Sequence, residues 1–212
     1  MKKLLLVSCG LLAGGTVQAI PYPVAAPACP AQVQVAAAGP VELISNGNFE
    51  TDSSLGGRAD YGYWNNGAST ASWSGEGEVG LQKTNNNHPW CASICEGDHI
   101  VYLQRAGAIS QTVTLSADGL YRLSFSFAAR PTHTGHEVKV FLDERELVDI
   151  VSTSTAWAQK EVLFRASNGT YTLRFVGISR EGIDDATTID CVSLKAARQP
   201  AFGTLVANAG FE

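Results

Sequence analysis

The chain has 212 residues, of which 45% are hydrophobic and 17% are charged, and its formal net charge is −5. An acidic protein repels polyanions, so this balance argues against nucleic acid as a partner. No apolar run reaches the roughly 20 residues that a membrane-spanning helix requires, so no membrane span is predicted.

The first 19 residues carry the three parts of a secretory signal peptide. Lys2 and Lys3 form the charged part, residues 4–13 the apolar part, and Val17-Gln18-Ala19 the cleavage site. We therefore expect a mature chain that starts near Ile20 and is secreted or periplasmic. A lipoprotein box, Leu6-Val7-Ser8-Cys9, is the minor alternative and would anchor the protein through a lipid on Cys9.

Three segments follow the signal peptide. Residues 20–40, rich in Ala, Pro and Val, indicate a linker, and residues 41–197 suit one domain. Residues 198–212 form a tail that ends in Asn-Ala-Gly-Phe-Glu, close to the Asn-Gly-Asn-Phe-Glu string of residues 46–50. That string combines a turn, an expected core anchor in Phe49 and a carboxylate in Glu50. We expect the tail to carry a truncated repeat of this motif or a spare edge strand, not a second module.

Two stretches, residues 51–77 and 84–98, are predicted to be long loops, because Gly, Ser, Asn and aromatic residues dominate them. Loops on a rigid sheet commonly carry binding residues. Within the second loop, Cys91 and Cys95 predict a loop-closing disulfide, since exported proteins form disulfides. A zinc site that adds His88 and His99 to the two cysteines is the alternative, although the spacing matches no familiar zinc pattern.

Most of the remaining chain alternates apolar and polar residues with a period of two, which predicts strands. Leu123, Phe125 and Ala129 alternate with Arg122, Ser124 and Arg130. The same alternation recurs at residues 138–142, 162–164 and 171–175. Asp118-Gly119 and Asn168-Gly169 each separate two such runs, which predicts two β-hairpins. No window of eleven or more residues has a helical period, so we predict an antiparallel all-β sandwich.

The order of the motifs resembles that of the galactose-binding-domain-like β-sandwiches. The motifs are residues 43–50 (Leu-Ile-Ser-Asn-Gly-Asn-Phe-Glu), Trp73 before residues 77–82, residues 109–113, residues 121–131 and residues 189–194 (Ile-Asp-Cys-Val-Ser-Leu). The chain is similar to secreted proteins of the domain of unknown function 642 type, and more loosely to carbohydrate-binding modules of families 4, 9 and 22. This resemblance covers nearly all of residues 41–195.

The resemblance implies a jelly-roll of eight or more strands in which the first and last strands are adjacent. It also implies a structural Ca²⁺ beside those strands, with Glu50 and Asp190 as ligands. Ca²⁺ prefers hard oxygen ligands, which two carboxylates would supply. The family often has a second Asp or Asn where this chain has Cys191, which weakens the expected site. From its alternation with Ile189, Cys191 itself is expected to be a buried thiol.

Sugar-binding proteins combine flat aromatic rings, which face the apolar side of a pyranose, with polar groups that reach its hydroxyls. The candidates here lie mainly in the two loops: Tyr61, Tyr63, Trp64, Asn66, His88, Trp90 and Arg130. Trp73 and Trp157 start strand-like runs and are expected to pack in the core. Arg122, Ser124, Ser126 and Arg130 would share the outward face of one strand and could form a binding surface.

Signals for catalysis are weak. No nucleophile elbow, phosphate loop or His-Glu-x-x-His motif occurs in the sequence. Glu76 and Glu78 could share a strand face as a glycosidase pair, but such carboxylates normally come from different elements across a cleft. His133 and His136 are expected in a solvated turn, and Asp184-Asp185 in a turn or an ion site.

These observations together predict a non-catalytic, exported module that binds extracellular or cell-wall polysaccharide. The alternative is a structural or protein-interaction module of the cell surface or extracellular matrix, with a cell-surface protein as its partner. An uncharacterised hydrolase is the third possibility.

Overall fold

The period-two alternation produces strands throughout the computed structural model, which describes residues 40–83, 97–178, 180 and 183–197. One short 3-10 helix, η1 (Trp64–Asn66), is present in these residues. The strands within them are β1 (Ser54–Leu55), β2 (Tyr61–Tyr63), β3 (Ala68–Ser69), β4 (Ser74–Glu76), β5 (Val79–Lys83), β6 (His99–Gln104), β7 (Ala108–Leu115), β8 (Gly119–Ala129), β9 (His136–Leu142), β10 (Arg145–Ser152), β11 (Ala158–Ala166), β12 (Gly169–Ile178) and β13 (Ala186–Ala196).

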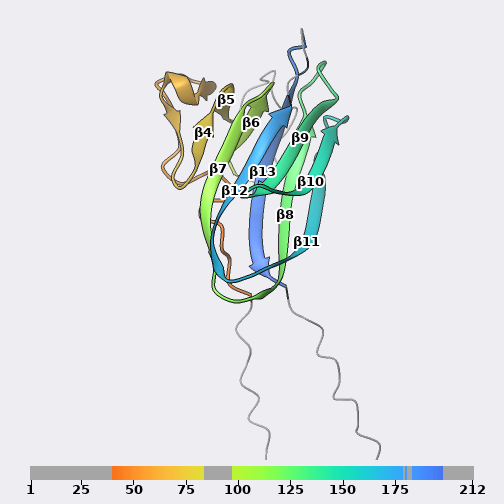
Figure 1. Ribbon diagram of the computed structural model, residues 1–212. Helices are drawn as coiled ribbons and strands as arrows, with labels where there is room; N and C mark the ends of the chain where they lie inside the picture. The colour runs from red at the N-terminus through yellow and green to blue at the C-terminus, as the bar shows by residue number, and fades with distance from the viewer. Residues whose placement is uncertain (1–39, 84–96, 179, 181–182, 198–212) are drawn as a thin grey trace, which may run out of the picture. The chain divides into compact units, whose positions relative to one another are not determined.

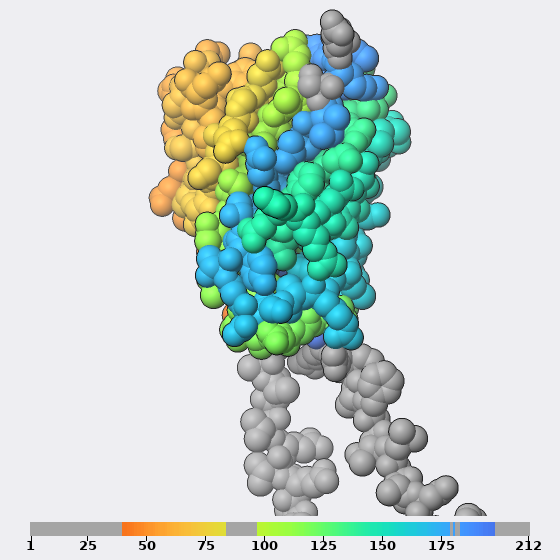
Figure 2. Space-filling view, viewed as in Figure 1, coloured from red at the N-terminus to blue at the C-terminus, as the bar shows by residue number. Residues whose placement is uncertain are grey.

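Two antiparallel sheets form a β-sandwich (Figure 1). One sheet has five strands in the order β10-β9-β12-β7-β4, and the other has six in the order β11-β8-β13-β6-β5-β2. Strands β1 and β3 pair separately as a small two-stranded sheet. In Figure 2 the five-stranded sheet faces the viewer, with the surface of β12 between that of β7 and that of β9 and β10. The predicted fold class is therefore confirmed.

The core lies between the two sheets and is rich in aromatic rings. Phe125 of the six-stranded sheet meets Phe175 of the five-stranded sheet edge to face, with ring centroids 5.1 Å apart. Trp73 packs against Phe49 with centroids 5.3 Å apart, and its indole Nε1 donates to the carbonyl of Asn46. Burying one such ring contributes roughly 2–3 kcal/mol. The expected core positions of Phe49 and Trp73 are confirmed.

The first described segment pairs with the last strand. Glu42 bridges to Lys195, the amide of Leu43 donates to the carbonyl of Leu194, and the amide of Val192 donates to the carbonyl of Gly47. A Cβ at Gly47 would lie 1.9 Å from the Val192 oxygen, so only glycine permits this approach. This pairing confirms the implied adjacency of the first and last extended segments.

The two predicted hairpins are wrong. Asp118-Gly119 connects β7 to β8, and Asn168-Gly169 connects β11 to β12, but each pair of strands lies in opposite sheets. Both turns are crossovers between the layers. The amide of Asn168 donates to Asp118 Oδ1 at 2.7 Å, so the two crossovers lie side by side. Turn residues specify a reversal of the chain, and the same reversal can lead into the other sheet.

Three further expectations need correction. Trp157 precedes β11, is only partly buried and lies outside the core cluster. Cys191 is half-buried at the irregular register of β13, where its φ of 53° places it in the left-handed region. His136 does not lie in a solvated turn, because it begins β9 and is fully buried.

Several predictions concern residues outside the described ranges. They are the signal peptide, the linker up to residue 39, Cys9, His88, Trp90, the disulfide between Cys91 and Cys95, and the tail. Within the described ranges, no helix is long and apolar enough to cross a membrane.

Candidate functional site

Three tyrosines gather on the outer face of the six-stranded sheet. In the register of the sheet, Tyr63 of β2 faces Gly80 of β5, and Gly80 faces Tyr102 of β6. The rings of Tyr63 and Tyr102 meet edge to face with centroids 5.4 Å apart, and Tyr61 lies 6.4 Å from Tyr102. A Cβ at Gly80 would lie 2.3 Å from the Tyr102 hydroxyl oxygen, so glycine leaves the space in which this ring lies.

The phenols of Tyr63 and Tyr102 keep their protons. Burial raises the pKa of Tyr102 far above its usual range, and the neighbouring Tyr63 and Tyr61 raise it further. Burial also raises the pKa of Tyr63, with smaller contributions from Tyr61 and Glu78. The Tyr102 hydroxyl donates to the carbonyl of Gly62 at 3.2 Å. Both hydroxyl groups therefore act as hydrogen-bond donors at any physiological pH.

A chain of polar contacts leads from the tyrosines to Arg130. The Tyr63 hydroxyl donates to Gln104 Oε1 at 2.6 Å, and Gln104 Nε2 donates to Asp184 Oδ1. Asp184 Oδ2 lies 2.8 Å from an Arg130 guanidinium nitrogen, which also donates to the Asp184 carbonyl at 3.0 Å. Strands β2 and β6, the residue after β8 and the loop before β13 thus contribute to one connected network.

Asp184 remains a carboxylate in this network. Its partial burial acts to raise the pKa, but hydrogen bonds from Arg130 and Gln104 outweigh it and hold the pKa below its usual value. Arg105 lies beside the network, 3.8 Å from Asp184 Oδ1, and pairs with Glu78 at 2.9 Å. Asp184 and Arg105 are each partly open to solvent, so both charges are available to a ligand.

We call this region the tyrosine–arginine surface, made of Tyr61, Tyr63, Tyr102, Gln104, Arg130 and Asp184. It combines aromatic rings with a hydroxyl donor, a carboxylate and a guanidinium group. Tyr102 is fully buried and Gln104 nearly so, and these two residues hold the others in place. A ligand would therefore meet Tyr61, Tyr63 and Asp184 already ordered. Rings that cover apolar C–H groups beside fixed donors and acceptors suit the recognition of a polyhydroxylated ligand.

The structure brings together three of the seven predicted ligand-binding residues: Tyr61, Tyr63 and Arg130. Trp64 lies elsewhere, packed over the backbone of Gly75, where a Cβ would come 2.6 Å from its indole ring. Asn66 is exposed in η1. His88 and Trp90 lie outside the described residues.

Sequence reasoning missed Tyr102, Gln104 and Asp184 as members of this surface. The residues of β6 from Ile100 to Gln104 are all buried although Tyr102 and Gln104 face outward, so alternation gave no signal there. One signal was available, because Gln104 is a polar residue at the end of an apolar run. Its contact with Asp184 joins positions 80 residues apart, which no local pattern reveals.

The outward row predicted on β8 also lies on the six-stranded sheet. Arg122 is exposed and its Nε is 3.4 Å from a Glu161 oxygen on β11. Ser124 and Ser126 face the same side, opposite Glu161 and Gln159 of β11. This row extends the outer face away from the tyrosines.

The predicted calcium ligands Glu50 and Asp190 have different surroundings. Glu50 Oε1 accepts the backbone amides of Asp98 and His99 at 2.7 Å each, and Oε2 lies 2.9 Å from His99 Nδ1. Asp190 is fully buried and its Oδ1 accepts the amide of Cys191. Ca²⁺ requires six to eight oxygen ligands, whereas nitrogen donors surround the Glu50 carboxylate.

In the described part of the chain, no group of three or more His, Cys, Asp or Glu is placed to hold a metal ion. The donors around Glu50 therefore do not favour Ca²⁺. Calcium at Glu50 and Asp190 stays a prediction.

The carboxylates and imidazoles considered for catalysis do not converge. Glu76 pairs with Arg174 on the five-stranded sheet at 2.7 Å, whereas Glu78 pairs with Arg105. His133 is half-exposed and His136 is buried against the carbonyl of Arg105 at 2.8 Å. Asp184 and Asp185 also separate, because Asp185 pairs with Arg180 at 2.6 Å.

Comparison with known proteins places this geometry in context. Residues 42–194 match the family described as "Protein of unknown function (DUF642)". No curated protein matches the chain. The solved structure of TmCBM61 in complex with β-1,4-galactotriose has a TM-score of 0.54 and 18% identity, covering 74% of this chain and 99% of that chain. This likeness shows the fold.

Two further solved structures are less similar. The K1 cleaved adhesin domain of Lys-gingipain from Porphyromonas gingivalis has a TM-score of 0.48 and 16% identity, covering 65% of this chain and 98% of that chain. The CBM22-1 xylan-binding domain from Paenibacillus barcinonensis has a TM-score of 0.46 and 12% identity, covering 62% of this chain and 90% of that chain.

Proposed function

We propose that this chain, which belongs to the DUF642 family of proteins of unknown function, is an exported, non-catalytic module that binds extracellular or cell-wall polysaccharide. The observation that carries the proposal is the convergence of Tyr61, Tyr63 and Arg130 on one outer face of the six-stranded sheet. Sequence reasoning selected these three residues separately, and the fold brings them to one surface.

The chemistry of the tyrosine–arginine surface fits a sugar. Tyr61 and Tyr63 are half-buried, so their rings keep part of their area for the C–H face of a pyranose. The carboxylate of Asp184 accepts hydrogen bonds from hydroxyl groups, and the guanidinium groups beside it donate them. Because the side chains are already bonded to one another, binding orders few of them and costs little side-chain entropy.

The other parts of the proposal have separate support. The non-catalytic part is supported by Glu76 and Glu78, which are held by different arginines. The exported part is supported by the signal peptide predicted in residues 1–19. The galactotriose complex of the similar TmCBM61 structure makes β-1,4-galactan the first polysaccharide to test.

Affinity electrophoresis tests the proposal in gels that contain β-1,4-galactan, xylan, mannan or a mixed β-glucan. We expect at least one polysaccharide to retard the native protein. Tyr63→Ala should bind about tenfold more weakly, the equivalent of about 1.4 kcal/mol, because the stacking ring is lost. Tyr63→Phe keeps the ring and loses the hydroxyl with its bond to Gln104, so its loss of binding should be smaller.

Thr112→Ala serves as the control, because Thr112 is exposed on β7 of the other sheet. Thermal unfolding of every variant shows whether it is folded. A native protein that no polysaccharide retards, together with capture of a cell-surface protein, would instead support the structural or protein-interaction role.

A further inference from the structure

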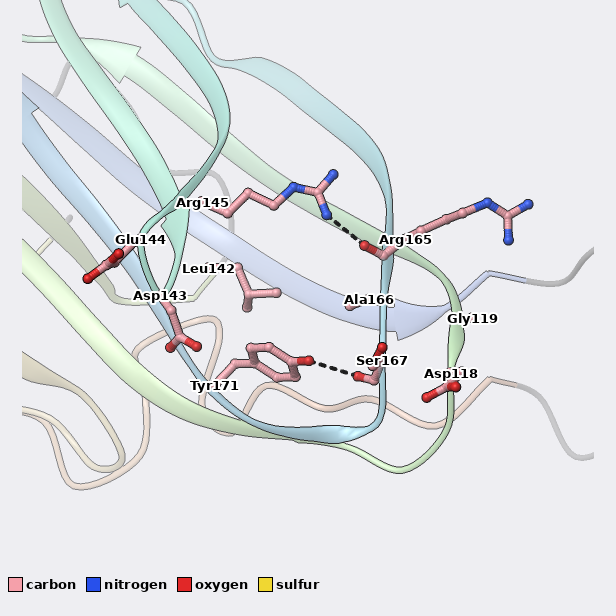
Figure 3. Close-up of a pocket in the computed structure, with 10 residues that line it drawn as sticks. All are labelled: Asp118, Gly119, Leu142, Asp143, Glu144, Arg145, Arg165, Ala166, Ser167 and Tyr171. Atoms are coloured by element: carbon pink, nitrogen blue, oxygen red, sulfur yellow. Dashed lines mark hydrogen bonds between the residues drawn. The ribbon is translucent and has the colours of Figure 1, made fainter.

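Three turns surround a pocket at one end of the sandwich (Figure 3). They are the two crossovers, β7–β8 and β11–β12, and the β9–β10 hairpin. The pocket has a volume of about 890 Å³. Small-molecule sites in proteins commonly measure about 300–1,000 Å³. The pocket is therefore large enough for a ligand of one or a few rings.

The floor of the pocket is apolar and its rim is charged. Leu142, Ala166 and the ring of Tyr171 form the floor (Figure 3). Five charged residues line the rim: Asp118, Asp143, Glu144, Arg145 and Arg165. In Figure 3 the guanidinium group of Arg145 lies over the floor, whereas that of Arg165 points away from it. No site was predicted here from the sequence, because the turns that build it are far apart in the chain.

Tyr171 presents a fixed aromatic surface. Its hydroxyl donates to the carbonyl of Ser167 at 3.1 Å. A Cβ at Gly169 would lie 3.3 Å from the ring, so the backbone at that residue supports one side of it. The side chain is half-buried, which leaves part of the ring accessible from the pocket. A fixed, partly exposed ring costs little entropy when a ligand stacks on it.

Three charged side chains of the rim, those of Asp118, Asp143 and Arg145, are also held in place. Asp118 Oδ1 accepts the amide of Asn168, and Asp143 Oδ1 accepts the amide of Thr172, both at 2.7 Å. Arg145 donates to the carbonyl of Arg165 at 2.7 Å and so joins the edges of the two sheets. Each carboxylate uses one oxygen in these bonds. Within the described residues, Oδ2 of neither aspartate has a hydrogen bond.

The mixture of charges selects against ions. A phosphate or another anion would meet the carboxylates of Asp118, Asp143 and Glu144. A metal dication would meet the guanidinium group of Arg145, and no metal-binding group occurs among the described residues. A neutral ligand with hydroxyl groups can bond to both kinds of charge and can place an apolar face on Tyr171.

We propose that this pocket is a second glycan site, which binds one sugar ring of a neutral polysaccharide against Tyr171. The proposal rests on the carbohydrate-binding function proposed above and adds a separate place for it. Gly119 at the pocket and Arg130 at the tyrosine–arginine surface are at opposite ends of β8. At about 3.3 Å per residue, the strand separates the two sites by roughly 35 Å. A single pyranose cannot reach both.

Backbone amide shifts of the native protein, measured by NMR, test this site. The probes are the methyl β-glycosides of galactose, glucose, mannose and xylose, added one at a time. We expect at least one probe to shift the amides of Asn168 and Thr172, because these amides bond to the rim carboxylates. Tyr171→Ala and Glu144→Gln should each weaken the titration of these two amides about tenfold or more. Tyr63→Ala should leave it unchanged.

Glu161→Gln is the matched control for Glu144→Gln, since both residues are exposed carboxylates and Glu161 lies outside the pocket. Glu144 makes no hydrogen bond within the described residues, so its substitution should not disturb folding.

Shifts that depend on Tyr63 alone would overturn the second site and keep the proposed function. Shifts that depend on Tyr171 and Glu144 alone would support the second site and remove the tyrosine–arginine surface as a binding site. No shifts with any probe would overturn the second site, and retardation in the polysaccharide gels would then still decide the proposed function.

Discussion

A single carboxylate, Glu50, joins the first described turn to the start of β6. It accepts two backbone amides and contacts the His99 imidazole, and Phe49 beside it is fully buried. The carboxylate therefore fixes the segment from Gly97 to His99 at the surface of the sandwich. A Cβ at Gly97 would lie 2.3 Å from Glu50 Oε1, so glycine leaves space for the carboxylate.

The role of Glu50 as an acceptor leads to a stability prediction. Glu50→Ala should lower the free energy of unfolding by about 2 kcal/mol, because hydrogen bonds to a charged group are lost. Glu50→Gln keeps one acceptor oxygen and should lose less. Urea denaturation of both variants measures the difference. Equal stability of Glu50→Ala and the native protein would contradict this role.

The same variants test the predicted calcium. A Ca²⁺ ion that binds only the folded protein would raise the thermal midpoint by mass action, and EDTA would reverse the rise. Such a rise, lost in Glu50→Ala, is the outcome that the calcium prediction requires. If neither Ca²⁺ nor EDTA changes the thermal midpoint, the calcium prediction is wrong.

At the scale of elements, the two crossovers act as a pair. The bond from the Asn168 amide to Asp118 Oδ1 is the contact that joins them. Asp118→Ala should therefore cost about 1–2 kcal/mol of unfolding free energy, whereas Asp118→Asn keeps an acceptor and should cost less. Ser116→Ala, at an exposed position before the same turn, is the control. Hydrogen exchange at Asn168 should become faster in Asp118→Ala, and unchanged exchange would contradict the coupling.

The strands were predictable because one face of each strand is buried. Burial of one face makes apolar and polar residues alternate within the strand's own sequence. Leu123 and Phe125 are buried as their positions indicated. The partners of those strands were not predictable in the same way. Asp118-Gly119 and Asn168-Gly169 indicate reversals of the chain, but the reversal alone does not choose between the two layers.

The candidate site was predictable in part for the same reason. Tyr61 and Tyr63 were predictable from the composition of their loop, and Arg130 from its alternation with the apolar residues that precede it. Tyr102 is hidden in an apolar run, and Asp184 gains its role only when the loop before β13 folds back to Arg130. The pocket around Tyr171 needs three turns at once and leaves no local signal.

At the scale of the whole molecule, His136 links stability to pH. Burial lowers the pKa of this imidazole, although its bond to the Arg105 carbonyl and the nearby Asp185 act against the shift. In the unfolded chain the His136 imidazole binds a proton near pH 6.5, whereas in the folded protein it does so only at a lower pH. The free energy of unfolding should therefore fall as the pH drops below about 6.5, by at most about 1.4 kcal/mol per pH unit.

Urea denaturation between pH 5 and pH 8 measures this slope. His136→Gln should remove most of it, and His133→Gln is the matched substitution at a half-exposed histidine. Asp184 and Glu42 have lowered pKa values, so their contributions are lost only below about pH 4, outside this window. A slope that survives in His136→Gln would assign the effect to another group.

The pairing of Glu42 with Lys195 has a consequence for protein engineering. Because the chain enters and leaves the sandwich at adjacent positions, a short peptide could join these two residues without strain. New chain ends could then be opened in the exposed β9–β10 turn at Asp143 and Glu144. For the same reason the sandwich could be inserted into a surface loop of an unrelated host protein, whose own chain would continue almost from the point at which it was interrupted.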